Sequence, residues 1–488
     1  MSHPIGRPLV RTGGGLLAVL CAATLALAPE PAAGQAAAPA TSTTPSAQAT
    51  QERTSRISDD SVPRLDVEHY PARPKPIVEI GPRFLGNGNI SRPFRLPTGA
   101  LWLPQVIVYG THSTAVQGVK SPTTGRWTNE WSNRLDLFTN LQLSGTERLL
   151  VGFRPLDDRG GATGYNFTPG VVARGDHHVN AELHSLFFEG DFGEIFPLLD
   201  RVDRRRLDIG FSVGRQQFAF QDGLLINDDA VDAVGVTRNT VLPRGGSNLQ
   251  LTGLYGWGSL EGSNNLRRQH SQLFGLVTVA DLGKSTFNAE VFLVDDRAGA
   301  NDGVYWAVSR TRRHGALNTT FRALGSYALH DQAVAGVVDT GHLLFSEMSF
   351  TPPWTKDLAY VNAFWAIGDF TSVSRAPGTG GPLGRAGILF GSPGFGRYPA
   401  PLSNRANDTA GGSVGYQKFF EEGGRRQMIV EIGGRRSQAR TQETSAAAGT
   451  RFQQAFGRHT VLQFDVFGKA IRRGRAVAGL RLETRFEF

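Results

Sequence analysis

Cysteine is nearly absent from this sequence: the 488-residue chain contains one, Cys21. Cys21 lies in an N-terminal segment that has the features of a cleaved signal, so we expect the mature chain to contain none. Without cysteine, the mature chain can form neither disulfide bonds nor metal sites built from thiolates.

Long apolar runs are also scarce. Hydrophobic residues make up 40% of the chain and the mean hydropathy is −0.22, which excludes a bundle of membrane-spanning helices. Glycine is abundant, with 60 residues. Because glycine destabilises helix interiors and favours turns, we expect many short strands. The formal net charge of +8 indicates an acidic partner without specifying its kind.

One short apolar run, residues 16–28, follows Arg7 and Arg11 and precedes small residues. A basic start, a short apolar stretch and a small-residue exit are typical of a secretory signal peptide, and the run is too short for a transmembrane helix. We predict a signal peptide at residues 1–34. Leu20 precedes Cys21 where a lipoprotein signal has a small residue, which argues against lipid attachment.

Three further regions follow the predicted cleavage site. Residues 35–60 are rich in Ala, Thr and Pro and have too little apolar surface to order themselves, so we predict a disordered leader. Residues 61–97 are rich in Pro and Arg, and we expect an extended periplasmic segment; a periplasmic domain is the alternative. Residues 98–488 have a different pattern and form the main domain.

That main domain shows apolar residues at every second position. The segments RLDLFTNLQL (134–143), RLLVGFR (148–154), HTVLQFDVFGK (459–469) and AGLRLETRFEF (478–488) all alternate in this way. A period of two residues is typical of strands with one apolar face. The opposite face carries arginines and carboxylates together, and no sustained helical period interrupts the region.

A soluble β-sandwich would also alternate, but three features favour a transmembrane barrel. The pattern continues for nearly 400 residues without a break in composition. Very short turns such as SGTE and EEGG alternate with long loops, as they do in outer-membrane barrels. A large secreted chain without cysteine must also protect the edges of its sheet, and a sheet that closes into a barrel has no free edge. At about ten residues per crossing, we predict an all-β, single antiparallel barrel of 16 or 18 strands with a water-filled lumen.

The C-terminal strand resembles the assembly signal of bacterial outer-membrane barrel proteins. Alternating apolar residues lead to a final phenylalanine, and the residues that match are Leu480, Leu482, Phe486 and Phe488. The resemblance implies that these side chains face lipid and are recognised by the barrel-assembly machinery. Residues 481–487 of the opposite parity would then face the lumen.

A second resemblance concerns residues 208–235. A strand that ends in Gly214, Arg215 and Gln216, followed by an aromatic residue and a turn at Gly223, resembles the alginate-export type of outer-membrane porin. The sequence departs from that pattern after Gly223, where Leu224 and Leu225 replace an expected arginine. The resemblance implies a porin more strongly than it implies alginate as the solute.

The arginines on the predicted lumen faces indicate which solutes the channel would favour. According to the alternation, six arginines lie on or near these faces: Arg134, Arg148, Arg154, Arg215, Arg481 and Arg485. Rings of basic side chains favour anions over cations, although pairs such as Arg481 and Glu483 could cancel. Strict parity places Arg215 on the lipid face, so we expect a β-bulge near Gly214 to turn it inward.

Several other clusters have weaker functional implications. The group Asp228, Asp229 and Asp232 lacks the ligand order of a calcium loop, and nothing completes a metal shell around His177, His178 and His184. The glycine-rich stretch 381–396 lacks the context of a phosphate loop, and we expect a long flexible loop that could fold into the pore. The basic runs 204–206 and 435–436 could face anionic headgroups or lie in the rim.

These observations predict an outer-membrane channel of a Gram-negative-type bacterium, without cofactor or metal and without a nucleic-acid partner. Its expected partners are outer-membrane lipid, the barrel-assembly machinery and an anionic small molecule or oligosaccharide. The alternative is a barrel enzyme of the lipase or protease type, which requires a serine–histidine or paired-acid site. His184 and Ser185 are adjacent on a predicted strand, so they point to opposite faces and cannot form one.

Overall fold

The computed structural model describes most of the chain after residue 73. The described ranges are 74–82, 92–158, 161–199, 207–243, 245–262, 267–268, 270–297, 301–330, 333, 337–421, 423–438 and 443–488. The predicted signal peptide and leader, residues 1–60, lie outside these ranges. In the described part of this chain, no helix is long and apolar enough to cross a membrane.

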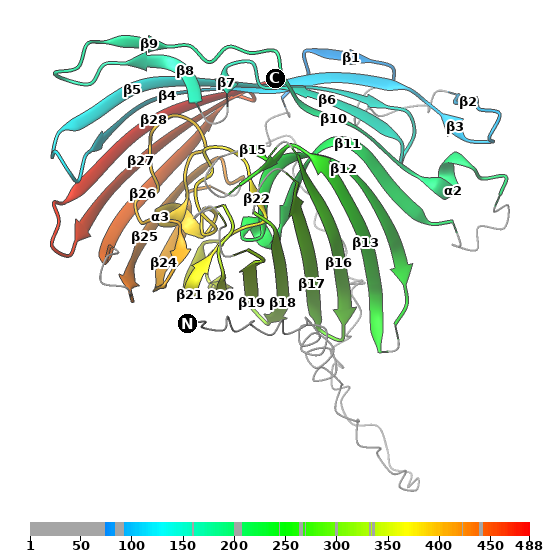
Figure 1. Cartoon of the computed structure of the whole chain (residues 1–488). Coiled ribbons are helices and arrows are strands. Elements are labelled where there is room, and N and C mark those ends of the chain that lie inside the picture. Colours follow the sequence, from blue (N-terminus) through cyan, green and yellow to red (C-terminus); the bar gives the residue numbers. More distant parts are fainter. Residues whose placement is uncertain are drawn as a thin grey trace, which may run out of the picture. The chain divides into compact units, whose positions relative to one another are not determined.

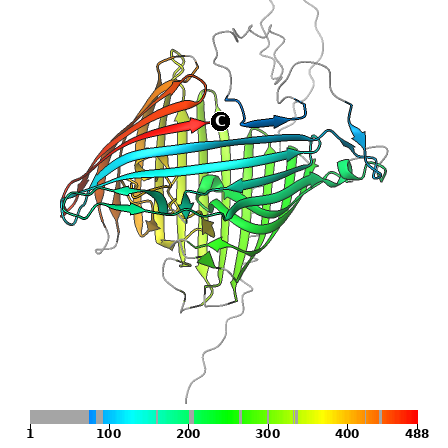
Figure 2. The ribbon, with the colours of Figure 1, turned by 90° about the horizontal axis from the view of Figure 1, so that it is seen from above.

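The described residues form a closed antiparallel barrel of 18 strands, which confirms the predicted fold class (Figure 2). One of the 18 is interrupted and consists of β6 followed by β8. The barrel strands are β4 (Gln105–Lys120), β5 (Trp127–Gln142), β6 (Arg148–Phe153) with β8 (Gly161–Asn166), β10 (Leu183–Asp191), β11 (Ile209–Phe220), β12 (Ile226–Val241), β13 (Gly246–Gly258), β16 (Ser271–Leu282), β17 (Ser285–Asp296), β18 (Gly303–His314), β19 (Leu317–Ala328), β20 (Gly341–Phe350), β21 (Leu358–Phe370), β24 (Thr409–Phe419), β25 (Arg426–Ser437), β26 (Ser445–Phe456), β27 (Thr460–Ile471) and β28 (Val477–Glu487).

Smaller elements lie in the connections and before the barrel. They are β1 (Val78–Ile80), β2 (Phe94–Arg95), β3 (Leu101–Trp102), β7 (Asp157–Asp158), β9 (Arg174–Asp176), α2 (Phe192–Ile195), the 3-10 turn η2 (Gln221–Gly223), β14 (Leu260–Glu261), β15 (Arg267–Arg268), β22 (Ser374–Arg375), α3 (Gly387–Phe390) and β23 (Ala406–Asn407). Two of them, β1 and β2, fall in the segment 61–97 that we expected to be extended.

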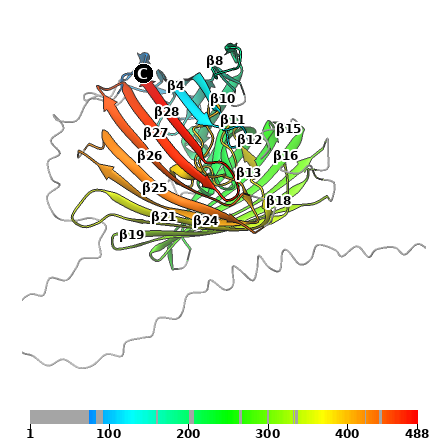
Figure 3. The same ribbon diagram turned by 90° about the vertical axis from the view of Figure 1, so that its left-hand side faces the viewer.

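The last strand closes the barrel against the first. Strand β28 pairs with β4 in the register Leu482 to Val116 (Figure 3), and the backbone of Phe488 exchanges hydrogen bonds with Gly110 at the end of this ladder. Strand β1 pairs with residues 106–108 of the same β4, so β1 and β28 lie in line along one edge.

Alternation along β28 separates its two faces as the sequence predicted. Arg481 and Glu483 are buried inside the barrel, whereas Leu480, Leu482 and Phe486 are exposed on its outer face. Charged side chains on a wide barrel's inner face meet water, and apolar ones outside meet lipid. The hydrophobic pattern therefore sets which residues line the lumen.

The two ends of the barrel differ in their connections. Turns as short as residues 283–284, 315–316 and 457–459 lie at one end, where β28 also finishes; we call it the short-turn end. The opposite, long-loop end carries the connection 371–408 between β21 and β24. This connection, the lumen loop, folds back inside the wall, where α3 is visible among the strands in Figure 1.

Candidate functional site

The lumen loop begins with an anchor to the tip of the β11–β12 hairpin. Strand β22 pairs in parallel with Ile226 and Asn227 of β12. The guanidinium of Arg375 donates to the carbonyl oxygen of Gly223 at 2.9 Å, to that of Gly380 at 2.6 Å and to the hydroxyl of Ser372 at 3.0 Å. Burial lowers the pKa of Arg375 to about 9, so it stays charged at neutral pH.

A second anchor holds α3 against the wall. The carboxylate of Glu431 on β25 accepts hydrogen bonds from the amides of Ile388 at 2.8 Å and Leu389 at 3.4 Å, and also from the hydroxyl of Tyr360. Gly387 has a φ of +79° and packs so closely that a Cβ there would lie 2.5 Å from the Glu431 carboxylate. Only glycine fits both the space and the backbone angle.

A third anchor lies at the far side of the lumen, against β4, β5 and β28. The ring of Phe395 covers the guanidinium of Arg481 at 4.9 Å, and a Cβ on Gly396 would lie 2.3 Å from the Gln117 amide nitrogen. Arg397 donates to Asp176 at 3.0 Å. The loop therefore crosses the lumen from one wall to the other.

A hydrophobic core fills the space between the lumen loop and the wall of β13 and β16–β21. Loop residues such as Leu383, Leu389 and Phe390 pack there with Leu225 of the hairpin tip and Phe292 of β17. The predicted loop does fold into the pore, but it is packed rather than loose. Apolar packing therefore occupies part of the lumen that we expected to be water-filled.

The other half of the lumen holds a cavity of ≈ 640 Å³. It lies between the lumen loop and the inner faces of β4–β6 and β26–β28. Six arginines line it: Arg134, Arg154, Arg385, Arg451, Arg481 and Arg485. Four carboxylates accompany them: Asp136, Asp228, Glu483 and Glu487. The lining is thus rich in cationic groups that are partly balanced by acids.

The structure brings four of the six predicted arginines together in this cavity and places the other two elsewhere. Arg134 and Arg154 both bind Asp136, at 2.9 and 2.7 Å. Arg485 is 3.6 Å from Glu483. Arg148 also faces inward, but it lies near the short-turn end, where it pairs with Glu189.

Arg481 differs from the other cavity arginines because it is covered. Its side chain is 1% exposed, and it bonds to Gln117 at 3.0 Å and to Glu483 at 2.6 Å beneath the ring of Phe395. A solute in the cavity therefore cannot reach it directly. It acts as a support for the lumen loop in this conformation.

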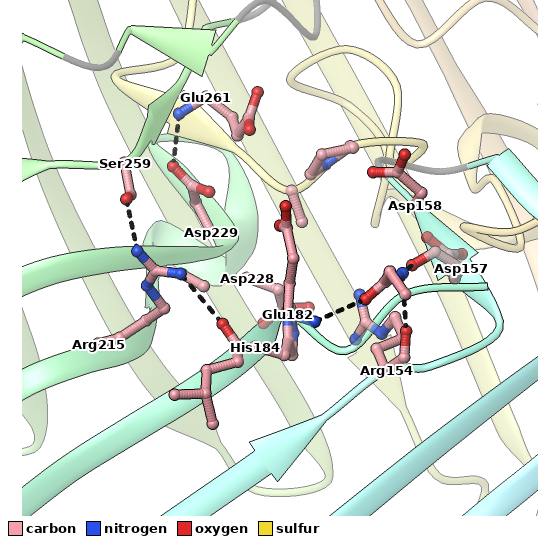
Figure 4. A pocket seen from close by; sticks show the side chains of 15 residues that line it. Arg154, Asp157, Asp158, Glu182, His184, Arg215, Asp228, Asp229, Ser259 and Glu261 are labelled. Carbon is pink, nitrogen blue, oxygen red and sulfur yellow. Dashed lines mark hydrogen bonds between the residues drawn. The ribbon is translucent and has the colours of Figure 1, made fainter. Parts of the chain in front are cut away.

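Arg215 lines a smaller recess beside the main cavity, together with Arg154, Glu182 and His184 (Figure 4). It forms an ion pair with Asp232 at 2.9 Å and donates to the carbonyl of Leu183 at 3.1 Å. Six carboxylates surround this recess: Asp157, Asp158, Glu182, Asp228, Asp229 and Glu261.

The predicted bulge at Gly214 is wrong in position. The ladder runs through Gly214 without a shift, and the irregularities lie between Leu183 and Ser185 on β10 and between Phe218 and Ala219 on β11. Arg215 pairs with Leu186 of β10 and Asp232 of β12, and its guanidinium reaches the carbonyl of Leu183 at the start of β10. Gly214 itself has a φ of +123°.

The remaining motif residues are structural. Gln216 donates to the carbonyl of Ala233 at 3.3 Å. Gly223, with a φ of +84°, provides the carbonyl that binds Arg375. The motif that carried the family resemblance is therefore the stem and tip of the hairpin to which the lumen loop is anchored.

The other clusters are dispersed among different partners. Asp228 pairs with Arg385, Asp229 accepts from the amide of Glu261 at 2.9 Å, and Asp232 binds Arg215. Across the described ranges, no group of three or more His, Cys, Asp or Glu side chains is placed to hold a metal ion. The basic run 204–206 lies outside the described residues.

Arg435 faces neither lipid headgroups nor the rim, contrary to both readings of the run 435–436. It is buried and donates to the carbonyl of Arg405 at 3.1 Å and to the hydroxyl of Thr409 at 3.2 Å. It therefore holds the end of the lumen loop. Its neighbour Arg436 is exposed.

Sequence reasoning missed three residues of the site. Arg451 follows the same parity as the other wall arginines and could have been found from the alternation of RFQQAF. Arg385 and Phe395 lie in the irregular lumen loop, whose path no periodicity specifies. Their positions depend on the anchors at Arg375 and Glu431.

Comparisons with known proteins agree with the fold. No family model matches the sequence, and no curated protein does. Solved structures that resemble this one include OccK2 (OpdF) and OccK7 (OpdD) of Pseudomonas aeruginosa and a BenF-like porin of Pseudomonas fluorescens Pf-5. Each has a TM-score of 0.50 and covers 78% of this chain; 97%, 98% and 98% of their own chains are covered, at 10%, 8% and 10% identity. This likeness shows a shared fold.

Proposed function

We propose that this protein is a porin of the outer membrane of a Gram-negative-type bacterium, and that it passes hydrophilic anionic solutes by passive diffusion. The short-turn end faces the periplasm, as it does in barrels of this type. Acidic sugars and other organic carboxylates are the solutes that we favour, because guanidinium groups bind carboxylates in a bidentate fork.

The observation that supports this proposal is the arginine lining of the ≈ 640 Å³ cavity. Arg134 of β5, Arg485 of β28 and Arg154, which follows β6, reach the cavity surface from the wall, and Arg385 lines it from the lumen loop. Charges on both sides of a narrow, low-dielectric passage raise the local concentration of anions. The resemblance to alginate-export porins leaves the identity of the acidic solute a prediction.

The alternative of a barrel enzyme has weaker support. The ring of His184 meets the side-chain amide of Gln217, while Ser185 packs against Gly152. The two candidates for a nucleophile and its base are thus directed to different partners, and a serine–histidine mechanism requires a hydrogen bond between them.

The proposal is tested by ion selectivity in planar bilayers. Replacing Arg134, Arg154 and Arg485 together by glutamine should lower the anion-to-cation permeability ratio by roughly tenfold at low salt. The effect should shrink at 1 M salt, where the screening length is about 3 Å. Each single replacement should lower the ratio by part of this effect, and Arg148→Gln is the matched control for them, since it removes one positive charge on the inner face but away from the cavity. An unchanged ratio in the triple variant would overturn anion selectivity.

A further inference from the structure

A second cavity, of ≈ 430 Å³, lies in the other half of the lumen. It is bounded by the hairpin tip η2 and by the inner faces of β13 and β16–β19. Along β17, Asn288 and Glu290 line it, whereas Phe292 and Val294, further toward the long-loop end, belong to the hydrophobic core. The core therefore lies on the long-loop side of this cavity, and the lining of this cavity shares no residue with that of the arginine-lined cavity.

The charges around this cavity are mainly negative. Arg322 is held between Asp222 and Glu347, so its charge is already balanced. Glu290, which is 3% exposed, accepts a hydrogen bond from the side-chain amide of Gln221. Among the residues that the structure describes, no cationic group lies within ion-pair distance of Glu290. A buried carboxylate usually has a cationic partner.

Two amide oxygens at the same cavity also lack partners. The oxygen Oε1 of Gln221 is buried and accepts no hydrogen bond, and neither does Oδ1 of Asn288. Gln221 is 6% exposed, and its orientation is fixed because its Nε2 must face the carboxylate of Glu290. Buried polar groups are nearly always hydrogen-bonded. These unpaired acceptors therefore point to a missing donor.

The backbone of the tip supports the same reading. Gln221 and Asp222 have φ values of 52° and 51°, a left-handed conformation that residues other than glycine seldom adopt. This conformation places both side chains at the cavity. Such a backbone is expected where the surrounding structure, or a ligand, requires the side chains in one position.

We propose that this cavity binds a small organic cation that carries a primary ammonium group. Three N–H donors of such a group match the three acceptors: the Glu290 carboxylate and the amide oxygens of Gln221 and Asn288. The volume leaves room for a short organic chain. The site is distinct from the arginine-lined passage and would be reached from the short-turn end.

The test is calorimetric titration of the full-length barrel in detergent with n-butylammonium chloride. The wild-type protein should bind it, and Glu290→Gln should weaken binding by at least about tenfold, because the charge-assisted bonds are lost. Asp281→Asn is the matched control: it removes a carboxylate from the same inner face of β16, near the short-turn end and outside the cavity lining, where Thr286 donates to it at 2.6 Å. This control should bind as the wild type does.

A second cation distinguishes N–H donation from charge alone. Butyltrimethylammonium, which has the same charge but no N–H donor, should bind about tenfold more weakly than n-butylammonium. Equal binding of the two cations would overturn the proposal, and so would displacement by equimolar sodium or unchanged binding in Glu290→Gln. If Glu290→Gln does not form a heat-modifiable barrel, Asn288→Leu provides the same test, with binding expected to fall severalfold.

Discussion

At the scale of single residues, Arg375 shows how a buried cation can serve as a structural clamp. It is fully buried, and within the described ranges no carboxylate lies at ion-pair distance from it. Its partners are two carbonyl oxygens and a hydroxyl from separate turns. A planar guanidinium reaches several acceptors at fixed angles, which the single ammonium of lysine cannot do.

Arg375→Lys should therefore loosen the lumen loop while keeping the charge. Losing one hydrogen bond to a charged group costs about 1.5–3 kcal/mol, so opening of the loop should become about tenfold or more easier. Trypsin cleavage after Arg385 and Arg397 in the purified barrel, followed by mass spectrometry, measures this opening. Arg436→Lys, at an exposed position, is the control; equal cleavage rates in the two variants would contradict the role of Arg375.

At the scale of elements, the lumen loop decides which wall charges a solute can meet. Phe395 covers Arg481, while Arg385 of the same loop adds a charge to the cavity. The loop thus removes one arginine from the passage and contributes another. Strand parity alone does not describe the charge that lines the channel.

Two variants separate the covered arginine from the exposed ones. Arg481→Gln should leave the anion-to-cation permeability ratio close to that of the wild type, because the side chain is out of reach. Phe395→Ala should uncover Arg481, widen the cavity and raise the ratio about two- to threefold at low salt. Reversal potentials in asymmetric salt measure both. A large drop in Arg481→Gln would show that the buried charge acts through the field after all.

The fold could be predicted from the sequence because alternation is a local property that a strand keeps whatever its neighbours are. The faces of Arg134, Arg154, Arg481 and Arg485 follow directly from it. Alternation shows on which face of the wall a side chain lies, but not its height along the barrel. The prediction therefore grouped Arg148 with the arginines of the cavity, although Arg148 lies near the short-turn end. It also carries no information about Phe395, which covers Arg481 from a loop without any period.

Alternation along the strand also did not give the position of Arg215. Arg215 has the outward parity on β11, yet its guanidinium lines the recess, where it binds Asp232 and reaches the carbonyl of Leu183 at the start of β10. The lengths of neighbouring strands and the positions of the register shifts are set by tertiary contacts. They could not be read from residues 208–235 alone.

At the scale of the whole molecule, the barrel depends on one seam between strands that are remote in sequence. Replacing Phe488 by aspartate should reduce the amount of heat-modifiable barrel in outer-membrane fractions severalfold. A charge on the lipid face costs about 2–4 kcal/mol at mid-membrane and about 0–1 near the interface, so we expect the main effect to come from loss of the aromatic side chain at the closing seam. Glu487→Asp, on the inner face, is the control. Wild-type levels of barrel in the Phe488 variant would count against this role.

The meeting of β1, β4 and β28 has a consequence for the order of folding. Arg481 and Gln117, which are bonded across the seam, are 364 residues apart, so closing this seam forms a very large loop and carries a high entropy cost. The free side of β4 stays unpaired until β28, the last strand of the barrel, joins it. An exposed edge invites association with other chains. Strand β1, only 25 residues from β4, can occupy part of that edge early, and it limits how much of the strand stays open while the ring is incomplete.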